Sequence, residues 1–178
     1  MVRNDIKKEF GDYQTPGYFA VKVCNLLKDK LKISPAVVID PTCGVGNFLK
    51  AALNVFDNVK EAVGVEINKE YCGKCRERIR DPRLGVTHGN FFSHEVTKHL
   101  KDETLFIGNP PWAMNANLKF NLPQKVNFKG LSGTDALTGA SNFDICEYII
   151  LKLIEGSLGK NVSIAMLCKT IRSQECAA

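Results

Sequence analysis

Short apolar runs alternate along the chain with segments whose apolar residues recur at helical spacing. Five runs rich in β-branched and aliphatic residues are typical of buried strands, at residues 36–40, 61–66, 85–89, 104–109 and 162–167. Helical spacing is found at residues 16–31, 46–56, 67–80, 93–101 and 141–157. Strands that alternate with helices favour right-handed crossovers and a parallel sheet covered by helices on both faces. The pattern therefore predicts a doubly wound α/β fold.

Local signals mark where some of these helices begin. Pro16 is expected in the first turn of the first helix, Asn68 is expected to cap the third, and Ser141 or Asn142 the last. Residues 113–140 break the pattern, because they are rich in Asn, Lys, Gly and Ser and show little periodicity. A segment of this length without regular structure is usually functional or disordered, and its position directly after the single tryptophan favours a function.

Composition narrows the class of protein. The 178 residues are 44% hydrophobic and 24% charged, as expected of one soluble globular domain. No apolar run approaches the roughly 18 residues that a membrane span needs, and residues 1–13 are too polar for a signal peptide, so we expect a cytoplasmic protein. The net charge of +5 favours an anionic partner such as nucleic acid, although many small proteins carry as much.

The seven cysteines are scattered, and several lie in apolar runs where a reduced cysteine serves as a small hydrophobic residue. Cys72 and Cys75 have the spacing of half a zinc site or of a redox pair. A four-ligand zinc site needs a second pair, and no other cysteines have this spacing. We therefore expect no metal site.

The segment "VVIDPTCGVGNFLKAAL" is predicted to form a strand, a glycine turn and a helix, the arrangement in which nucleotide-like ligands bind. Leu49 occupies the third glycine position of a dinucleotide motif, and Asp40 at the strand end would repel a pyrophosphate, which disfavours a dehydrogenase. A carboxylate at this point suits a positively charged cofactor such as S-adenosylmethionine (SAM), which carries a sulfonium and an ammonium group. A purely structural turn is the alternative.

The next two predicted strands also end in polar or aromatic residues. Glu66 closes the second strand, where an acidic side chain can accept hydrogen bonds from both ribose hydroxyls. Asn90 and Phe91 follow the third strand and are candidates for contacts with the adenine ring. The ligand crevice of an open parallel sheet lies at the carboxyl ends of its strands, so these residues predict one shared cofactor site.

The fourth predicted strand runs into "GNPPW". The side-chain oxygen of Asn109 and the carbonyl of Pro110 can accept both hydrogens of an exocyclic amine, which keeps the nitrogen lone pair directed at a methyl donor. Pro111 stiffens the turn, and Trp112 offers a flat surface on which stacking is worth roughly 1–3 kcal/mol per base. These four residues are the candidate catalytic residues for methyl transfer to a planar amine.

"DPTCGVGNF" together with "NPPW" resembles the amino-methyltransferases, and most closely the adenine-N6 DNA methyltransferases. The resemblance implies a Rossmann-like class I SAM-dependent methyltransferase fold in which the first motif binds SAM and the second holds a flipped adenine. "FGDYQTP" resembles the segment that covers the methionine end of SAM in this family, and "FDICEYII" the helix whose start, at Phe143 and Asp144, borders the cofactor. The expected cofactor-binding residues are Tyr13, Gln14, Thr15, Pro16, Asp40, Pro41, Cys43, Gly44, Gly46, Asn47, Phe48, Glu66, Ile67, Asn90, Phe91, Asn109 and Phe143.

The order of these motifs resembles that of enzymes whose target-recognition domain follows the catalytic domain. The fifth predicted strand lies close to the end of the chain, so we expect residues 1–178 to be the N-terminal portion of a catalytic domain, truncated after that strand. Residues 1–35 would cover the cofactor, and residues 36–178 would form the core with the loop 113–140. A C-terminal target-recognition domain or a separate specificity subunit would complete the enzyme.

The implied reaction is direct methyl transfer from SAM to adenine N6 in double-stranded DNA, as in restriction-modification, with the base flipped out of the duplex. Three lysines, Lys119, Lys125 and Lys129, either contact DNA phosphates or form a solvated face. One alternative keeps the chemistry but places it on a ribosomal RNA base or a protein glutamine amide. Another is a non-catalytic fragment that binds SAM or DNA within a larger assembly.

Overall fold

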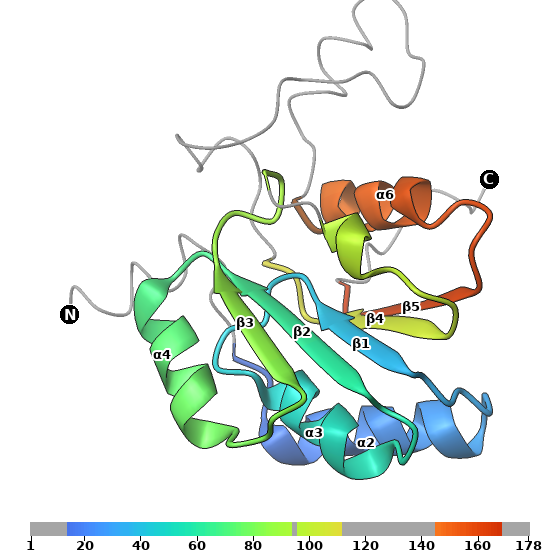
Figure 1. Cartoon of the computed structure of the whole chain (residues 1–178), viewed down its shortest axis with the longest axis horizontal. Helices are drawn as coiled ribbons and strands as arrows, with labels where there is room; N and C mark the ends of the chain where they lie inside the picture. The colour runs from blue at the N-terminus through green and yellow to red at the C-terminus, as the bar shows by residue number, and fades with distance from the viewer. Residues whose placement is uncertain (1–13, 94–95, 112–144, 169–178) are drawn as a thin grey trace, which may run out of the picture.

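The computed structural model describes residues 14–93, 96–111 and 145–168, which form a parallel sheet with helices on both faces (Figure 1). The strands are β1 (Val37–Asp40), β2 (Glu61–Glu66), β3 (Leu84–His88), β4 (Thr104–Gly108) and β5 (Val162–Met166). Their order is β3-β2-β1-β4-β5, and every neighbouring pair is parallel. The chain thus winds outward in both directions from β1, and the predicted doubly wound, Rossmann-like fold is confirmed.

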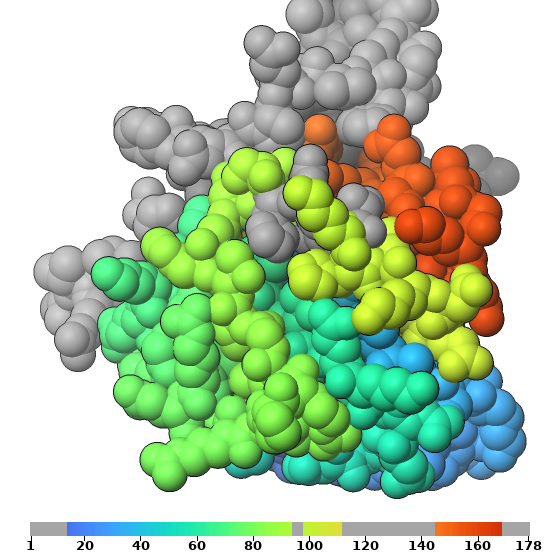
Figure 2. Space-filling model, in the orientation of Figure 1, coloured from blue at the N-terminus to red at the C-terminus, as the bar shows by residue number. Residues whose placement is uncertain are grey.

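The helices divide between the two faces. On one face lie α2 (Gly17–Asp29), α3 (Asn47–Val55) and α4 (Lys69–Arg78), and on the other lie the 3-10 helix η1 (Val96–His99) and α6 (Ile145–Gly156) (Figure 1). Each layer of helices closes over its own hydrophobic cluster. Figure 2 shows α4 along one side of the molecule, where its charged residues are exposed while Cys72 and Cys75 are buried beneath them.

Strand β4 shows how the apolar runs produce this two-sided core. All five of its residues are buried. Leu105 and Ile107 join the cluster beneath α2 and α3, whereas Phe106 joins the cluster beneath α6. Successive side chains of a strand point to opposite faces, so a strand between two helical layers needs a continuous apolar run.

The predicted strands agree with the structure to within one residue at each end. The Asn68 cap is also confirmed, since its Oδ1 accepts hydrogen bonds from the backbone N–H groups of Glu70 (2.9 Å) and Tyr71 (3.3 Å). Pro16 lies immediately before α2, and its carbonyl accepts the first hydrogen bonds of that helix. The alternative caps of the last helix, Ser141 and Asn142, lie outside the described residues, as does the loop 113–140.

The helix predicted over residues 93–101 is wrong in the part that the structure describes, where only the single 3-10 turn η1 forms. The chain must turn sharply into β4 just after this segment. The Thr104 hydroxyl donates to the Lys101 carbonyl (2.7 Å) and accepts from the Lys101 N–H (3.2 Å), and Glu103 has a positive φ of 62°. These local hydrogen bonds replace the backbone bonds that a longer helix would need.

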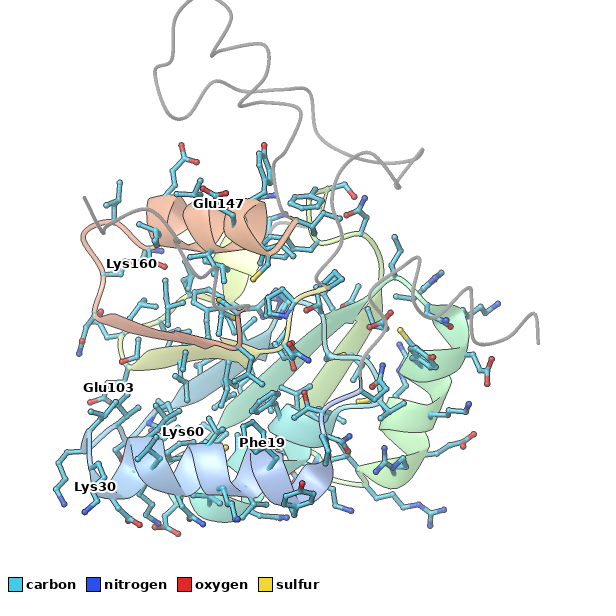
Figure 3. All side chains as sticks on the ribbon, turned by 180° about the vertical axis from the view of Figure 1, so that it is seen from behind. Phe19, Lys30, Lys60, Glu103, Glu147 and Lys160 are labelled. Carbon is cyan, nitrogen blue, oxygen red and sulfur yellow. The ribbon has the colours of Figure 1, made fainter. Side chains whose placement is uncertain are left out.

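The two edges of the sheet differ in character. Lys60 and Glu103 mark the amino edge, just before β2 and β4, in Figure 3. At that edge Glu61 binds His99 Nδ1 (3.0 Å) and Lys101 Nζ (2.9 Å). Within the described residues, no helix has the length and apolarity that a membrane span requires.

Burial predicts that alanine substitutions of two leucines differ strongly in their effect on the free energy of unfolding. Leu105 is fully buried in β4, whereas Leu158, after α6, is 73% exposed. Leu105→Ala is expected to lower the free energy of unfolding by roughly 2–5 kcal/mol, and Leu158→Ala to change it by no more than about 0.5 kcal/mol. Urea unfolding of both variants measures this difference, and equal losses would contradict the assignment of β4 to the centre of the core.

Candidate functional site

The carboxyl ends of β1 to β4 meet at one edge of the sheet. The parallel register pairs Asp40 with Gly64 and Glu66 with His88. Beyond the strands, the Cys43 N–H donates to the Val65 carbonyl and the Gly89 N–H to the Glu66 carbonyl, both at 2.9 Å. The predicted gathering of strand ends at a single edge is therefore confirmed.

The glycine turn between β1 and α3 depends on left-handed backbone conformations. Gly44 has φ +54° and Gly46 has φ +82°, values that glycine adopts without steric cost. A Cβ on Gly44 would clash with the side chain of Gln14, and one on Gly46 would clash with Cys75 Sγ and lie 2.7 Å from Ile79 Cδ1. The two glycines thus let the turn lie close to the N-terminal segment on one side and to α4 on the other.

Glu66 ties this turn to the end of β2. The residue is 8% exposed, and its Oε2 accepts a hydrogen bond from the Gly44 N–H (2.8 Å) while Oε1 accepts one from the Asn68 N–H (2.7 Å). The expected contact of Glu66 with ribose hydroxyls stays a prediction. The next residue, Ile67, is 61% exposed, which leaves a large apolar side chain open at this edge.

The N-terminal segment lies against the glycine turn. Gln14 Oε1 accepts a hydrogen bond from the Val45 N–H (3.1 Å), and Asn47 Nδ2 donates to the Thr15 carbonyl (2.7 Å). The structure thus brings Gln14 and Thr15 to the edge to which the sequence assigned them. Tyr13 lies outside the described residues.

Asp40 places a second carboxyl group at this edge. It is 2% exposed, and its Oδ1 accepts a hydrogen bond from the Thr42 N–H (3.1 Å). Burial, aided by the charge of Glu66 and opposed by the Thr42 hydrogen bond, raises the pKa of Asp40 to about 8. A cation bound beside Asp40 would favour its ionised form.

The catalytic candidates begin immediately beside Asp40. A Cβ on Gly108, the last residue of β4, would lie 2.6 Å from Asp40 Oδ1, so only glycine leaves room for the carboxyl group. Asn109 follows and is half-buried, Pro110 is buried and Pro111 is half-buried. The Leu167 N–H donates to the Gly108 carbonyl (2.9 Å) and fixes this strand end to the end of β5. Trp112, Phe143 and Asp144 lie outside the described residues.

Asn90 and Phe91, the residues expected near an adenine ring, both make contacts within the protein. Asn90 Oδ1 accepts a hydrogen bond from the Phe92 N–H (3.0 Å) and so stabilises the turn after β3. Phe91 is 5% exposed and packs into the cluster beneath α6, edge-to-face with Phe92 at 5.5 Å between ring centroids. Asn90 therefore has a structural role at this turn in addition to any contact with a ligand.

Cysteines support the turn from below. Cys43 and Cys75 are both buried, and a hydrogen bond between their thiols raises the pKa of Cys43 and lowers that of Cys75. Cys72 is buried as well, and its thiol donates to the Glu66 carbonyl at 3.4 Å. Within the described part of the chain, no group of three or more His, Cys, Asp or Glu residues is arranged to hold a metal ion.

Sequence reasoning missed two residues at this edge. The Thr42 hydroxyl oxygen is buried and has no hydrogen-bond partner within the described residues, and a polar ligand would satisfy such a group. Lys152 of α6 donates through Nζ to the Phe92 carbonyl at 2.7 Å. Threonine and lysine are common in turns and helices, and this lysine is 60 residues from its partner, so no local signal identifies either residue.

Comparisons with known proteins show that the chain is similar to methyltransferases. No family model matches it. It is 40% identical over 179 residues to the Type II methyltransferase M.NspV of Nostoc sp., in an alignment that covers 95% of this chain and 37% of that protein. The chain thus spans less than two fifths of the length of this relative. The resemblance to methyltransferases that the motifs indicate is confirmed by this similarity.

Two solved structures show a partial likeness. An RNA methyltransferase from Salinibacter ruber in complex with S-adenosyl-L-homocysteine is 16% identical, with 55% of this chain and 61% of that chain covered and a TM-score of 0.44. A type I restriction-modification system methyltransferase subunit from Streptococcus thermophilus is 15% identical, with 58% and 24% covered and a TM-score of 0.44.

The geometry of the glycine turn predicts opposite effects for two glycine substitutions. Gly46→Ala forces a side chain into a left-handed conformation and against Cys75, and is expected to destabilise the fold by roughly 1–3 kcal/mol. Gly73→Ala lies within α4, with no atom within 4 Å of the added Cβ, and is expected to stabilise the fold by about 0.5–1 kcal/mol. Thermal and urea unfolding measure both, and a neutral Gly46→Ala would contradict this turn geometry.

Proposed function

We propose that this chain, a relative of the Type II methyltransferase M.NspV, binds SAM at the carboxyl edge of its sheet as part of an enzyme that methylates adenine N6 in DNA. One observation carries the proposal. The buried carboxyl group of Asp40 lies directly against Gly108, so a cation site adjoins the turn that presents Asn109 and Pro110. A positively charged methyl donor and an amine acceptor would therefore meet at this point.

The described edge offers a complementary group for each part of SAM. Asp40 suits the cationic methionine end, and the glycine turn permits close approach of the ligand to the backbone. Glu66 suits the ribose hydroxyls, and the exposed side chain of Ile67 suits a face of the adenine ring. Further proposed cofactor-binding residues are Tyr13, Gln14, Thr15, Pro16, Pro41, Cys43, Asn47, Phe48, Asn90, Phe91, Asn109 and Phe143.

The protein would promote transfer mainly by positioning its substrates. The bound cofactor would supply a methyl group activated by a sulfonium. Asn109 Oδ1 and the Pro110 carbonyl would accept the two hydrogens of adenine N6, so that the nitrogen lone pair points at the methyl carbon rather than into the ring. Pro110 and Pro111 restrict the backbone that carries these acceptors. Trp112 would stack on the flipped base.

DNA is the proposed substrate because the relative is a Type II methyltransferase and because this chain carries a net charge of +5. Residues 1–35 would cover the cofactor and residues 36–178 would form the N-terminal part of the catalytic core. A target-recognition domain or a specificity subunit would select the DNA sequence. Lys119, Lys125 and Lys129 are candidates for phosphate contacts.

Two measurements test the proposal. The first is a calorimetric titration with SAM, with NAD as the control ligand, in which binding of SAM alone is expected. The second follows tritiated methyl transfer to unmethylated duplex DNA, ribosomal RNA and a protein with a glutamine acceptor, with N6-methyladenine in the DNA as the expected product. Labelling of RNA or protein would overturn the DNA substrate, and SAM binding without transfer to any acceptor would indicate a non-catalytic SAM-binding unit.

The raised pKa of Asp40 predicts that SAM binding releases a proton. In the free protein the carboxyl group has a pKa of about 8 and is mostly protonated at pH 7. A bound cation favours the carboxylate and lowers this pKa, so the complex holds fewer protons and the affinity rises as the pH increases toward 8. Above that pH the carboxyl group is ionised before binding, and its contribution to the pH dependence disappears.

Calorimetry at pH 7 in two buffers of different ionisation enthalpy counts the released protons. Asp40→Asn is the matched control, because the amino group of SAM titrates equally with both proteins. Wild type is expected to release up to one proton more than Asp40→Asn, which should also bind SAM more weakly. Equal proton counts would rule out Asp40 as the partner of the cationic cofactor.

Removal of the amide at the proposed catalytic turn should separate chemistry from cofactor binding. Asn109→Ala is expected to lower methyl transfer by about 10²-fold or more, because one acceptor of the N6 hydrogens is lost. SAM affinity should stay within about twofold, since the lost interaction is made with the acceptor base and the cofactor keeps its contacts with the other proposed cofactor-binding residues. The matched control is Asn58→Ala at the amino side of the sheet, where Asn58 bonds Ser34 Oγ (2.7 Å), and it should leave both quantities unchanged. Parallel loss of binding and transfer in Asn109→Ala would refute the assigned role.

A further inference from the structure

Lys152 of α6 binds the turn after β3. Its Nζ donates to the carbonyls of Phe92 (2.7 Å) and Phe91 (3.4 Å). The same ammonium lies 5.0 Å from the centroid of the Phe91 ring and 5.8 Å from that of Phe92. Two adjacent carbonyls and two aromatic rings therefore surround one cation that comes from α6.

This environment is unusual for a helical lysine, which ordinarily extends its ammonium group into water. Lys152 is half-buried, and burial lowers its pKa while the nearby Glu155 opposes the shift. Tyr148, one helical turn earlier, packs edge-to-face against Phe92 at 5.1 Å between centroids. Helix α6 therefore contacts the turn with two side chains, and Lys152 satisfies its backbone carbonyls.

The contacts fix the part of the turn that carries Asn90. The Phe92 N–H donates to Asn90 Oδ1, and the Phe92 carbonyl accepts from Lys152 Nζ. Both backbone polar groups of Phe92 are therefore restrained. Without the ammonium group, the two carbonyls would lose this donor. The backbone at residues 90–92 would then be free to shift relative to β2 and to the exposed Ile67 that follows it.

We infer that Lys152 is a positioning residue for the adenine end of the cofactor, because it fixes the turn at residues 90–92 against which the base would lie. The inference rests on the proposed SAM site and concerns recognition of the base. Lys152 acts through the backbone of the turn and does not touch the reacting atoms.

The test compares S-adenosylhomocysteine with S-inosylhomocysteine, which carries an oxygen in place of the exocyclic amine of adenine. Wild type is expected to prefer the adenine ligand. Lys152→Met keeps the length of the side chain but removes the donors, and it should weaken S-adenosylhomocysteine binding roughly tenfold and reduce the preference for adenine. Lys152→Arg retains charge and donors and should restore most of both. The control is Lys160→Met, in the turn between α6 and β5, which should behave as wild type (Figure 3).

Several outcomes overturn the inference. Unchanged binding by a folded Lys152→Met protein would do so, and so would equal loss for both ligands, which indicates a general structural role. If wild type binds neither ligand, the proposed function itself fails. A measurement on wild type alone covers the case in which Lys152→Met does not fold. S-adenosylhomocysteine is expected to slow amide hydrogen exchange at residues 90–93, and the absence of this protection would refute the assignment.

Discussion

The functional edge depends on the hydrogen bonds that the Glu66 carboxylate accepts. One of its oxygens binds the Gly44 N–H of the glycine turn, and the other binds the Asn68 N–H at the start of α4. Hydrogen bonds from N–H groups to a charged acceptor are stronger than neutral ones, and a buried carboxylate is tolerated only when it has such donors. A single side chain thus joins β2, the turn after β1 and the next helix.

Asp40 adds a second buried acidic group to the same edge. Its carboxyl group is buried close to Glu66, whose charge disfavours the ionisation of Asp40. Gly108 has no side chain and so leaves the space that the Asp40 carboxyl group occupies. Glycine within a strand ordinarily weakens the sheet. A core selected for stability alone would replace such a group by an apolar one. The arrangement is better explained by a cationic ligand that balances the charge.

Local patterns predicted most of this fold, and long-range contacts account for what they missed. Apolar runs located all five strands because a strand between two helical layers needs apolar residues on both faces. The Asn68 cap could be predicted because its partners lie two and three residues away. The bond from Lys152 to Phe92 spans 60 residues, and that from Arg78 to Asn47 spans 31. Such pairs arise when helices pack in the folded protein. Periodicity shows which side of a helix is buried, but not which distant residues that helix contacts.

The two helical layers support different parts of the site. Beneath the glycine turn, Cys75 of α4 and Ile79, which follows α4, fill the space that a side chain at position 46 would need. On the other face, Lys152 of α6 restrains the turn at residues 90–92. A ligand that spans both turns must cross the carboxyl end of β2, which lies between β1 and β3 in the sheet and ends in Glu66. The two ends of such a ligand would thus be held by separate helical layers, with Glu66 between them, and Asn109 would lie beyond the glycine turn at the end of β4.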